Sequence, residues 1–159
     1  MAEQTPSQTV GPFFHDGLRW KEGGRIAPKA DGKRIVLTGK LVDGGGNPVG
    51  DAMVEAWQAN PPGFGRVETA KDGTYRFETV MPSGSAPSLD ISIFSRGLLK
   101  PLHTRVHLGG VESARKDPLL APLAGSPRLA TLVAAATDDG QFRWDVRLQG
   151  EGETVFFAA

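Results

Sequence analysis

Three histidines are the side chains in this sequence best suited to metal binding or proton transfer. His103 and His107 stand four residues apart, and His15 lies near the N-terminus. Residues four apart on a strand point to the same face, but about 13 Å of extended chain separates them. That span is too long for one ion unless the strand bends. We therefore interpret His103 and His107 as residues of a polar strand face; a remodelled metal site that uses them with nearby acids is an alternative.

Other catalytic patterns are incomplete. Zero cysteines exclude thiolate metal sites, cysteine nucleophiles and a disulfide framework. Serine, histidine and aspartate are all present, so composition leaves a catalytic triad open, but no Gly-x-Ser-x-Gly elbow occurs. No phosphate-binding Gly-x-x-x-x-Gly-Lys loop occurs either. The glycines at 44–46 are better explained as a turn between strands, because glycine adopts positive φ without steric cost.

Composition is that of an ordinary globular domain. The chain has 159 residues, 39% of them hydrophobic and 23% charged, and its 18 basic residues balance 18 acidic ones. Without a basic stripe or an acidic tail, nucleic acid and anionic membranes are not the expected partners. Neither a signal peptide at the N-terminus nor an apolar stretch of membrane-spanning length is visible. We expect a cytoplasmic location.

The elements that must position any site are short strands. Apolar residues recur at every second position in six segments, which is the spacing of a half-buried strand. These segments lie at 34–41, 52–59, 74–80, 89–93, 102–108 and 142–148. Residues 44–50 are expected to form a turn, and the β-branched Thr131 and Val133 favour a further strand over 130–136.

These observations predict an all-β fold. Many short strands separated by Gly- and Pro-rich turns are typical of an antiparallel β-sandwich. Residues 1–33 carry turn signals without a helical or strand period, so we expect an irregular N-terminal arm. Residues 34–159 are then the sandwich, and the whole chain is one domain, as its length indicates.

Several segments, taken in order, resemble the intradiol ring-cleaving dioxygenases, whose fold is a β-sandwich. The segments are Thr5 to Phe14, Val54 to Ala59, Phe94 to Gly97, Leu102 to Arg105 and Gln149 to Phe157. The resemblance covers nearly the whole chain. It is weakest around Pro61 to Arg66, where this sequence is much shorter than is usual for the family.

The resemblance carries an expectation about iron. Catalytic members of the family hold ferric iron with two tyrosines and two histidines, whereas this chain has one tyrosine, Tyr75. The paired histidines of the family align with Ser88 and Asp90, which offer too few donors for the metal. The resemblance therefore implies an iron-free α-type subunit, inactive alone, that pairs with a homologous iron(III)-binding β subunit in an αβ hetero-oligomer.

The resemblance also implies a substrate pocket at the interface of the two subunits. Its positions in this chain are Thr9, Gly11, Pro12 and Phe13 from the arm, together with Arg96. The implied substrate is protocatechuate, cleaved by dioxygen between its hydroxyl-bearing carbons to 3-carboxy-cis,cis-muconate. A guanidinium suits the ring carboxylate of this substrate. The alternatives are an ion pair at a strand end for Arg96 and simple docking on the partner for the arm.

A second class of protein shares part of this pattern. The strand and turn formed by residues 39–43 and 46–49 also suit a transthyretin-like or carboxypeptidase-regulatory-like binding module without catalytic role. Such a module would explain the middle of the chain but neither of its ends.

Overall fold

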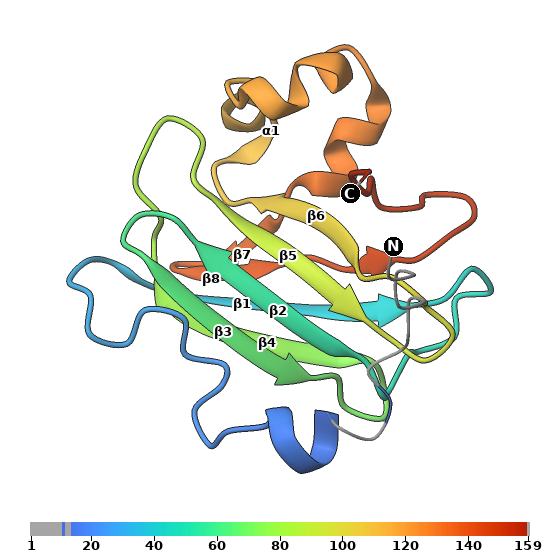
Figure 1. Cartoon of the computed structure of the whole chain (residues 1–159). Coiled ribbons are helices and arrows are strands. Elements are labelled where there is room, and N and C mark those ends of the chain that lie inside the picture. The colour runs from blue at the N-terminus through green and yellow to red at the C-terminus, as the bar shows by residue number, and fades with distance from the viewer. Residues whose placement is uncertain (1–10, 12–13, 159) are drawn as a thin grey trace, which may run out of the picture.

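The protein consists mainly of two β-sheets packed face to face, as the computed structural model shows for residues 11 and 14–158 (Figure 1). In strand order, the first sheet contains β4 (Thr74–Val80), β1 (Arg34–Val42), β8 (Gln141–Arg143) and β7 (Ala135–Asp138), and β9 (Val146–Arg147) also pairs with β1. The second sheet contains β3 (Gly63–Glu68), β2 (Met53–Gln58), β5 (Ser88–Phe94) and β6 (Leu102–His107). The predicted all-β sandwich is confirmed.

Two strand pairs depart from the expected antiparallel arrangement. β1 pairs in parallel with β8 and with β9, whereas the other strand pairs are antiparallel. A parallel pair needs a long connection between its strands, and here the whole second sheet lies between β1 and β8 in the sequence. Local periodicity carries no information about such a distant pairing.

The core lies between the sheets and is built by the period of two. Leu37 in β1, Phe77 in β4 and Ile91 in β5 are each at most 1% exposed, and their neighbours in sequence face outward. Burial of one such side chain stabilises the fold by about 1.5–3 kcal/mol. The alternation read from the sequence therefore identifies the inward faces of these strands correctly.

The N-terminal arm closes one open side of the sandwich. Its described part contains the π-helical turn η1 (Phe14–Leu18) and then lies between the edge strands β3 and β4. Ile26 accepts a hydrogen bond from Phe64 of β3 and donates one to the carbonyl of Glu78 in β4. Its side chain is 3% exposed within the core. This segment of the arm is thus hydrogen-bonded to both sheets.

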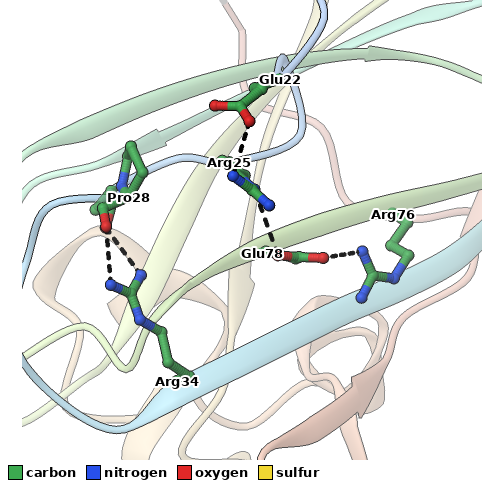
Figure 2. Close-up of polar contacts among 7 residues, drawn as sticks. Glu22, Arg25, Pro28, Arg34, Arg76 and Glu78 are labelled. Atoms are coloured by element: carbon green, nitrogen blue, oxygen red, sulfur yellow. Dashed lines mark hydrogen bonds and ion pairs between the residues drawn. The ribbon is translucent and has the colours of Figure 1, made fainter.

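Charged side chains fasten the arm on its outer side. Arg25 forms ion pairs with Glu22 and with Glu78, and Arg76 contacts the same Glu78 carboxylate (Figure 2). Arg34 donates hydrogen bonds to main-chain carbonyls of the arm, including that of Pro28 (Figure 2). These exposed ion pairs each contribute little stability, so the buried Ile26 is the main anchor.

A helical segment covers part of the outer face of the second sheet. It comprises α1 (Gly110–Ala114) and the 3₁₀ helices η2 (Pro118–Leu123) and η3 (Pro127–Leu132), which pack against the edge strand β6 (Figure 1). Its apolar side chains form a second, smaller core cluster with Val155. No helix among the described residues is long and apolar enough to cross a membrane.

The prediction of a strand over 130–136 was largely wrong. Residues up to Leu132 belong to η3, and β7 begins only at Ala135. The side chain of Ser126 accepts a hydrogen bond from Arg128 N–H, and Pro127 occupies the first helical turn. This Ser-Pro pair is a helix-start signal that outweighs the β-branched residues following it.

The expected strand over 142–148 is divided into β8 and β9. The burial alternation holds, with Phe142, Trp144 and Val146 buried, but residues 144–145 lie between the two strands. Here Tyr75 donates a hydrogen bond of 2.6 Å from its hydroxyl to the Trp144 carbonyl. The hydroxyl occupies the space beside Gly39, where a Cβ atom would lie 2.6 Å from it.

We expect Tyr75→Phe to lower the free energy of unfolding by about 1–2 kcal/mol, because it leaves the Trp144 carbonyl without this donor in a buried site. Urea denaturation of the purified chain measures the change. Thr137→Val is the matched control, since it removes an exposed hydroxyl with a long hydrogen bond of 3.4 Å. Equal stability of Tyr75→Phe and the wild type would contradict the prediction.

Candidate functional site

β5 carries the two positions at which the resemblance places the histidine ligands of the family. Ser88 and Asp90 point outward from the second sheet, and Leu89 between them is fully buried in the core. In the strand register, Ser88 lies opposite His107 and Asp90 opposite Arg105. The two positions therefore share one face, as the alternation predicts, and β6 supplies their neighbours.

An ion-pair network occupies this part of the face. Arg105 Nε lies 2.6 Å from Oδ1 of Asp90, and its Nη1 lies 2.7 Å from Oδ2 of Asp117. Asp117 is 6% exposed and also accepts a hydrogen bond from Leu119 N–H at the start of η2. Burial raises the pKa of Asp117, but the hydrogen bonds from Arg105 and Leu119 lower it by more. The pKa of this carboxyl therefore lies below its ordinary value. The network joins β5, β6 and the helical segment.

His107 lies on the polar face of β6, as interpreted, but this end of the face is not open to solvent. Its side chain is fully buried beneath the helical segment. Nε2 lies 3.2 Å from Oδ2 of Asp117 without hydrogen-bond geometry, and no hydrogen bond to Nδ1 is formed within the described residues. Burial lowers the pKa of His107 below its ordinary value, although the Asp117 carboxylate acts in the opposite direction. Helices that the sequence analysis did not predict cover this end of the face.

Because its pKa is lowered on folding, His107 binds a proton at higher pH in the unfolded chain than in the folded one. We therefore expect the free energy of unfolding to fall as the pH is lowered below 6.5, which is the ordinary pKa of histidine. The fall should be at most about 1.4 kcal/mol per pH unit. Urea denaturation between about pH 6.5 and pH 5 measures the slope and stays above the range where carboxylates protonate.

His107→Gln should flatten this pH dependence, whereas His103→Gln should retain it, because His103 is only partly buried. His103 Nδ1 lies 3.0 Å from the Ser92 hydroxyl, on the part of the sheet that the helices leave open. An unchanged slope in His107→Gln would show that another group is responsible.

Arg96 follows the end of β5, in the connection to β6. Its guanidinium contacts the carboxylate of Asp51, and its side chain is 83% exposed. Within this chain Arg96 therefore forms the strand-end ion pair that was the alternative interpretation. Its exposure leaves the guanidinium accessible to a second chain, so the role in a substrate pocket stays a prediction.

The arm residues predicted to line the pocket fall mostly outside the described residues, namely Thr9, Pro12 and Phe13. Gly11 is described: it is exposed, has a φ of 57° and accepts a long hydrogen bond of 3.5 Å from Phe14 N–H. Only glycine adopts this backbone conformation readily. The described part of the arm thus begins beside η1.

The residues of this chain do not fit ferric iron at the family position. Asp90 is bound to Arg105, and Ser88 is a poor ligand. The single tyrosine, Tyr75, lies in the core, where burial raises its pKa well above the ordinary value and its hydroxyl donates to Trp144. Among residues 11 and 14–158, no three His, Asp or Glu side chains are grouped so that they could hold a metal.

An aromatic cluster that the strand patterns did not predict lies on the same outer face. Trp57 of β2 and Phe64 of β3 lie opposite each other in the register, with ring centroids 4.3 Å apart. Trp20 of the arm stacks on Phe64 at 5.8 Å. The alternation in β2 could have revealed part of this cluster, because burial of Val54 and Ala56 requires Trp57 to face outward.

A pocket of about 790 Å³ lies elsewhere, beside β1, β4 and the β3–β4 connection. Its lining includes Lys40, Lys71, Arg76 and Arg143, but none of the predicted site residues. Arg76 and Arg143 are paired with Glu78 and Asp145. We assign this pocket no part in the site.

Solved structures with the same architecture define the class of fold. An intradiol ring-cleavage dioxygenase from Tetranychus urticae aligns with 92% of this chain and 94% of its own, at a TM-score of 0.65 and 17% identity. The dioxygenase domain of a carbohydrate-binding fusion from Streptomyces sp. SirexAA-E aligns with 93% of this chain and 99% of its own, at a TM-score of 0.61 and 18% identity. The fold is that of the intradiol dioxygenases.

Proteins related in sequence show to which family within this fold class the chain belongs. The protocatechuate 3,4-dioxygenase alpha chain of Pseudomonas putida is 37% identical over 192 aligned residues, which cover 97% of this chain and 96% of the relative. That of Burkholderia cepacia is 38% identical, with 98% and 97% covered. The beta chain from Burkholderia cepacia is 28% identical over 93% of this chain and 77% of its own length. No family model matches the sequence. This chain belongs to the family of protocatechuate 3,4-dioxygenase alpha chains.

The relatives are longer than this chain. The alignment with the Pseudomonas putida alpha chain spans 192 positions, whereas this chain has 159 residues, so that relative contains segments that this chain lacks. In the structure, only residues 59–62 connect β2 to β3. This short connection adjoins the stretch around Pro61 to Arg66, where the sequence is expected to be much shorter than is usual for the family.

Proposed function

We propose that this chain is the iron-free subunit of a protocatechuate 3,4-dioxygenase and pairs with a homologous beta-type subunit that binds iron(III). The complex would open protocatechuate between its two hydroxyl-bearing carbons with dioxygen, giving 3-carboxy-cis,cis-muconate. The observation that carries the proposal is the match to alpha chains over almost the whole length, combined with an ion pair of Asp90 and Arg105 at the family ligand position.

In this proposal the chain contributes to the pocket without binding the metal. The iron of the partner would supply the oxidative chemistry. Arg96, exposed at the end of β5, would provide positive charge for the ring carboxylate of the substrate. The arm segment of Thr9, Gly11, Pro12 and Phe13 would form a wall of the same pocket, and Gly11 would let the backbone approach a flat ring closely.

The comparisons disfavour the binding-module alternative. A transthyretin-like or carboxypeptidase-regulatory-like module would share only the middle of the chain, whereas the alpha-chain alignments cover 97% and 98% of it. Membership of a dioxygenase subunit family thus accounts for both ends of the chain.

Co-expression with a beta-type chain tests the proposed function. We expect the two chains to copurify as one species by size-exclusion chromatography, to contain iron, and to consume oxygen with protocatechuate. Each chain purified alone provides the control: this chain should be free of iron and inactive. Failure to associate with several beta-type chains, or iron held by this chain alone, would contradict the proposal.

A further inference from the structure

The outer face of the second sheet is divided into a covered half and an open half. The helical segment and its small core cluster pack against the edge strand β6, and α1 lies away from β2 and β3, which form the open half (Figure 1). The arm reaches this half at Leu18, whose carbonyl accepts a hydrogen bond from Arg66 of β3. The short β2–β3 connection adds no covering loop. On the open half, Trp57 is 51% exposed, and the neighbouring Trp20 is 45% exposed. A sheet face with such large apolar side chains in water indicates an interaction surface.

The aromatic rings and a neighbouring guanidinium form a packed platform, which we define by Trp20, Trp57, Phe64 and Arg66. The guanidinium of Arg66 lies 5.3 Å from the ring centroid of Trp20 and 5.4 Å from that of Phe64. Glu55 accepts hydrogen bonds from Nε and Nη2 of Arg66, the first at 2.8 Å. The carbonyl of Leu18 accepts a third hydrogen bond, of 3.3 Å, from Nη1. Stacking and these hydrogen bonds thus position the side chain of Arg66 before any partner binds.

Its composition suits an anchor of a protein interface. Tryptophan and arginine are enriched among residues that carry most of the binding energy, and they cluster in preformed contacts near the interface centre. Because the side chains of the platform are already ordered by stacking and hydrogen bonds, a partner would lose little conformational entropy in engaging them.

Chain connectivity indicates which partner binds there. The arm residues proposed to line the partner's pocket are followed at once by η1, and Trp20 lies two residues beyond its end. Gly11, the described one of these residues, accepts a hydrogen bond from Phe14 of η1, and Leu18 at the end of η1 accepts one from Arg66 of the platform. A subunit that contacts Gly11 would therefore lie near the platform. At the end of the same face, Phe94 lies beside Met53 in the register, and Arg96 follows two residues later. Arg96, a predicted pocket residue that the structure describes, thus lies at one end of this face.

We propose that the platform is the central anchor of the interface with the iron-binding beta-type chain. This inference rests on the proposed function, because it identifies the surface through which that complex forms. The ion pair of Arg19 with Glu68, 3.4 Å apart, ties the described part of the arm to β3 next to Trp20 of the platform.

Affinity measurements on purified wild-type and variant chains test the anchor. We expect Trp57→Ala to raise the dissociation constant for the beta-type chain by about 30-fold, the effect of a typical hot-spot residue. Trp20→Ala should act in the same direction. Leu119→Ala is the matched control: it removes an exposed side chain, 50% accessible, from the helical segment over the opposite edge strand, and should change the constant by less than about threefold.

Hydroxyl-radical footprinting of the wild-type chain provides a test that needs no variant. Oxidation of Trp20 and Trp57 should fall several-fold in the complex, whereas Trp144, only 3% exposed, should react equally in both states. The proposed anchor would be wrong if oxidation of Trp57 were the same in the free chain and in the complex, or if a folded Trp57→Ala chain bound the beta-type chain with wild-type affinity. Either result would leave the proposed function intact. If the wild-type chains do not associate at all, both proposals fail.

Discussion

Replacing Arg96 with alanine in the assembled complex is expected to lower kcat/KM for protocatechuate by about 10- to 100-fold. A charge-assisted hydrogen bond to a carboxylate contributes about 1.5–3 kcal/mol, and the loss of that energy gives this range. Because the ring carboxylate does not change during ring opening, most of the loss should be in KM, with kcat altered less. Steady-state oxygen uptake over a range of protocatechuate concentrations measures both constants.

Two comparisons separate substrate binding from assembly. Catechol lacks the carboxylate, so Arg96→Ala should leave its turnover by the same complex nearly unchanged. Asp51→Asn removes the acidic partner of Arg96 and should retain or increase the affinity for protocatechuate. A fully assembled Arg96→Ala complex with wild-type KM for protocatechuate would show that Arg96 serves only in the strand-end ion pair.

Removal of Arg105 is expected to destabilise the fold more strongly than the loss of the Tyr75 hydroxyl. Arg105→Leu leaves the carboxylate of Asp117, 6% exposed, without its cationic partner beneath the helical segment. Breaking a buried ion pair by removing one member costs about 3–5 kcal/mol. Asp90 adds little to this, since its side chain is 51% exposed and screened by water. Urea denaturation of the purified chain at neutral pH measures the loss.

Matched variants identify the cause of that loss. Combining Arg105→Leu with Asp117→Asn should restore part of the stability, because asparagine removes the unpaired charge and still caps η2. Arg115→Ala deletes an exposed arginine paired with Glu112 and should cost less than about 0.5 kcal/mol. If Arg105→Leu costs no more than Arg115→Ala, the network is not a stabilising element.

Much of the fold could be predicted from local patterns. The period of two identified β1, β2, β4, β5 and β6, and it assigned Leu37 and Ile91 to the core. The turn around Gly46, which has a φ of 83°, was also predicted correctly. The strand β3 was not predicted, because Gly63 and Gly65 interrupt its apolar alternation. Gly65 is nevertheless required there, since a Cβ atom would lie 2.9 Å from the carbonyl of Gly23 in the arm.

The candidate site was less accessible to such reasoning. Residue spacing showed that Ser88 and Asp90 share a face, but not that Arg105 reaches Asp90 from the neighbouring strand. His107 has the same parity as His103, yet only His107 is sealed beneath helices that begin several residues later. Periodicity describes which face a side chain occupies, whereas burial depends on what packs against that face.

By itself, the sequence determined the sandwich class, the inward residues of most strands, the family and the lack of a tyrosine pair for iron. These properties depend on residue type and on spacing within one element. Only the tertiary structure decided the parallel pairing of β1 with β8, the arm hydrogen-bonded to both sheets, and the grouping of Trp20 with Trp57 and Phe64. Each of these joins residues far apart in the chain, and their contacts arise from packing that local preferences do not encode.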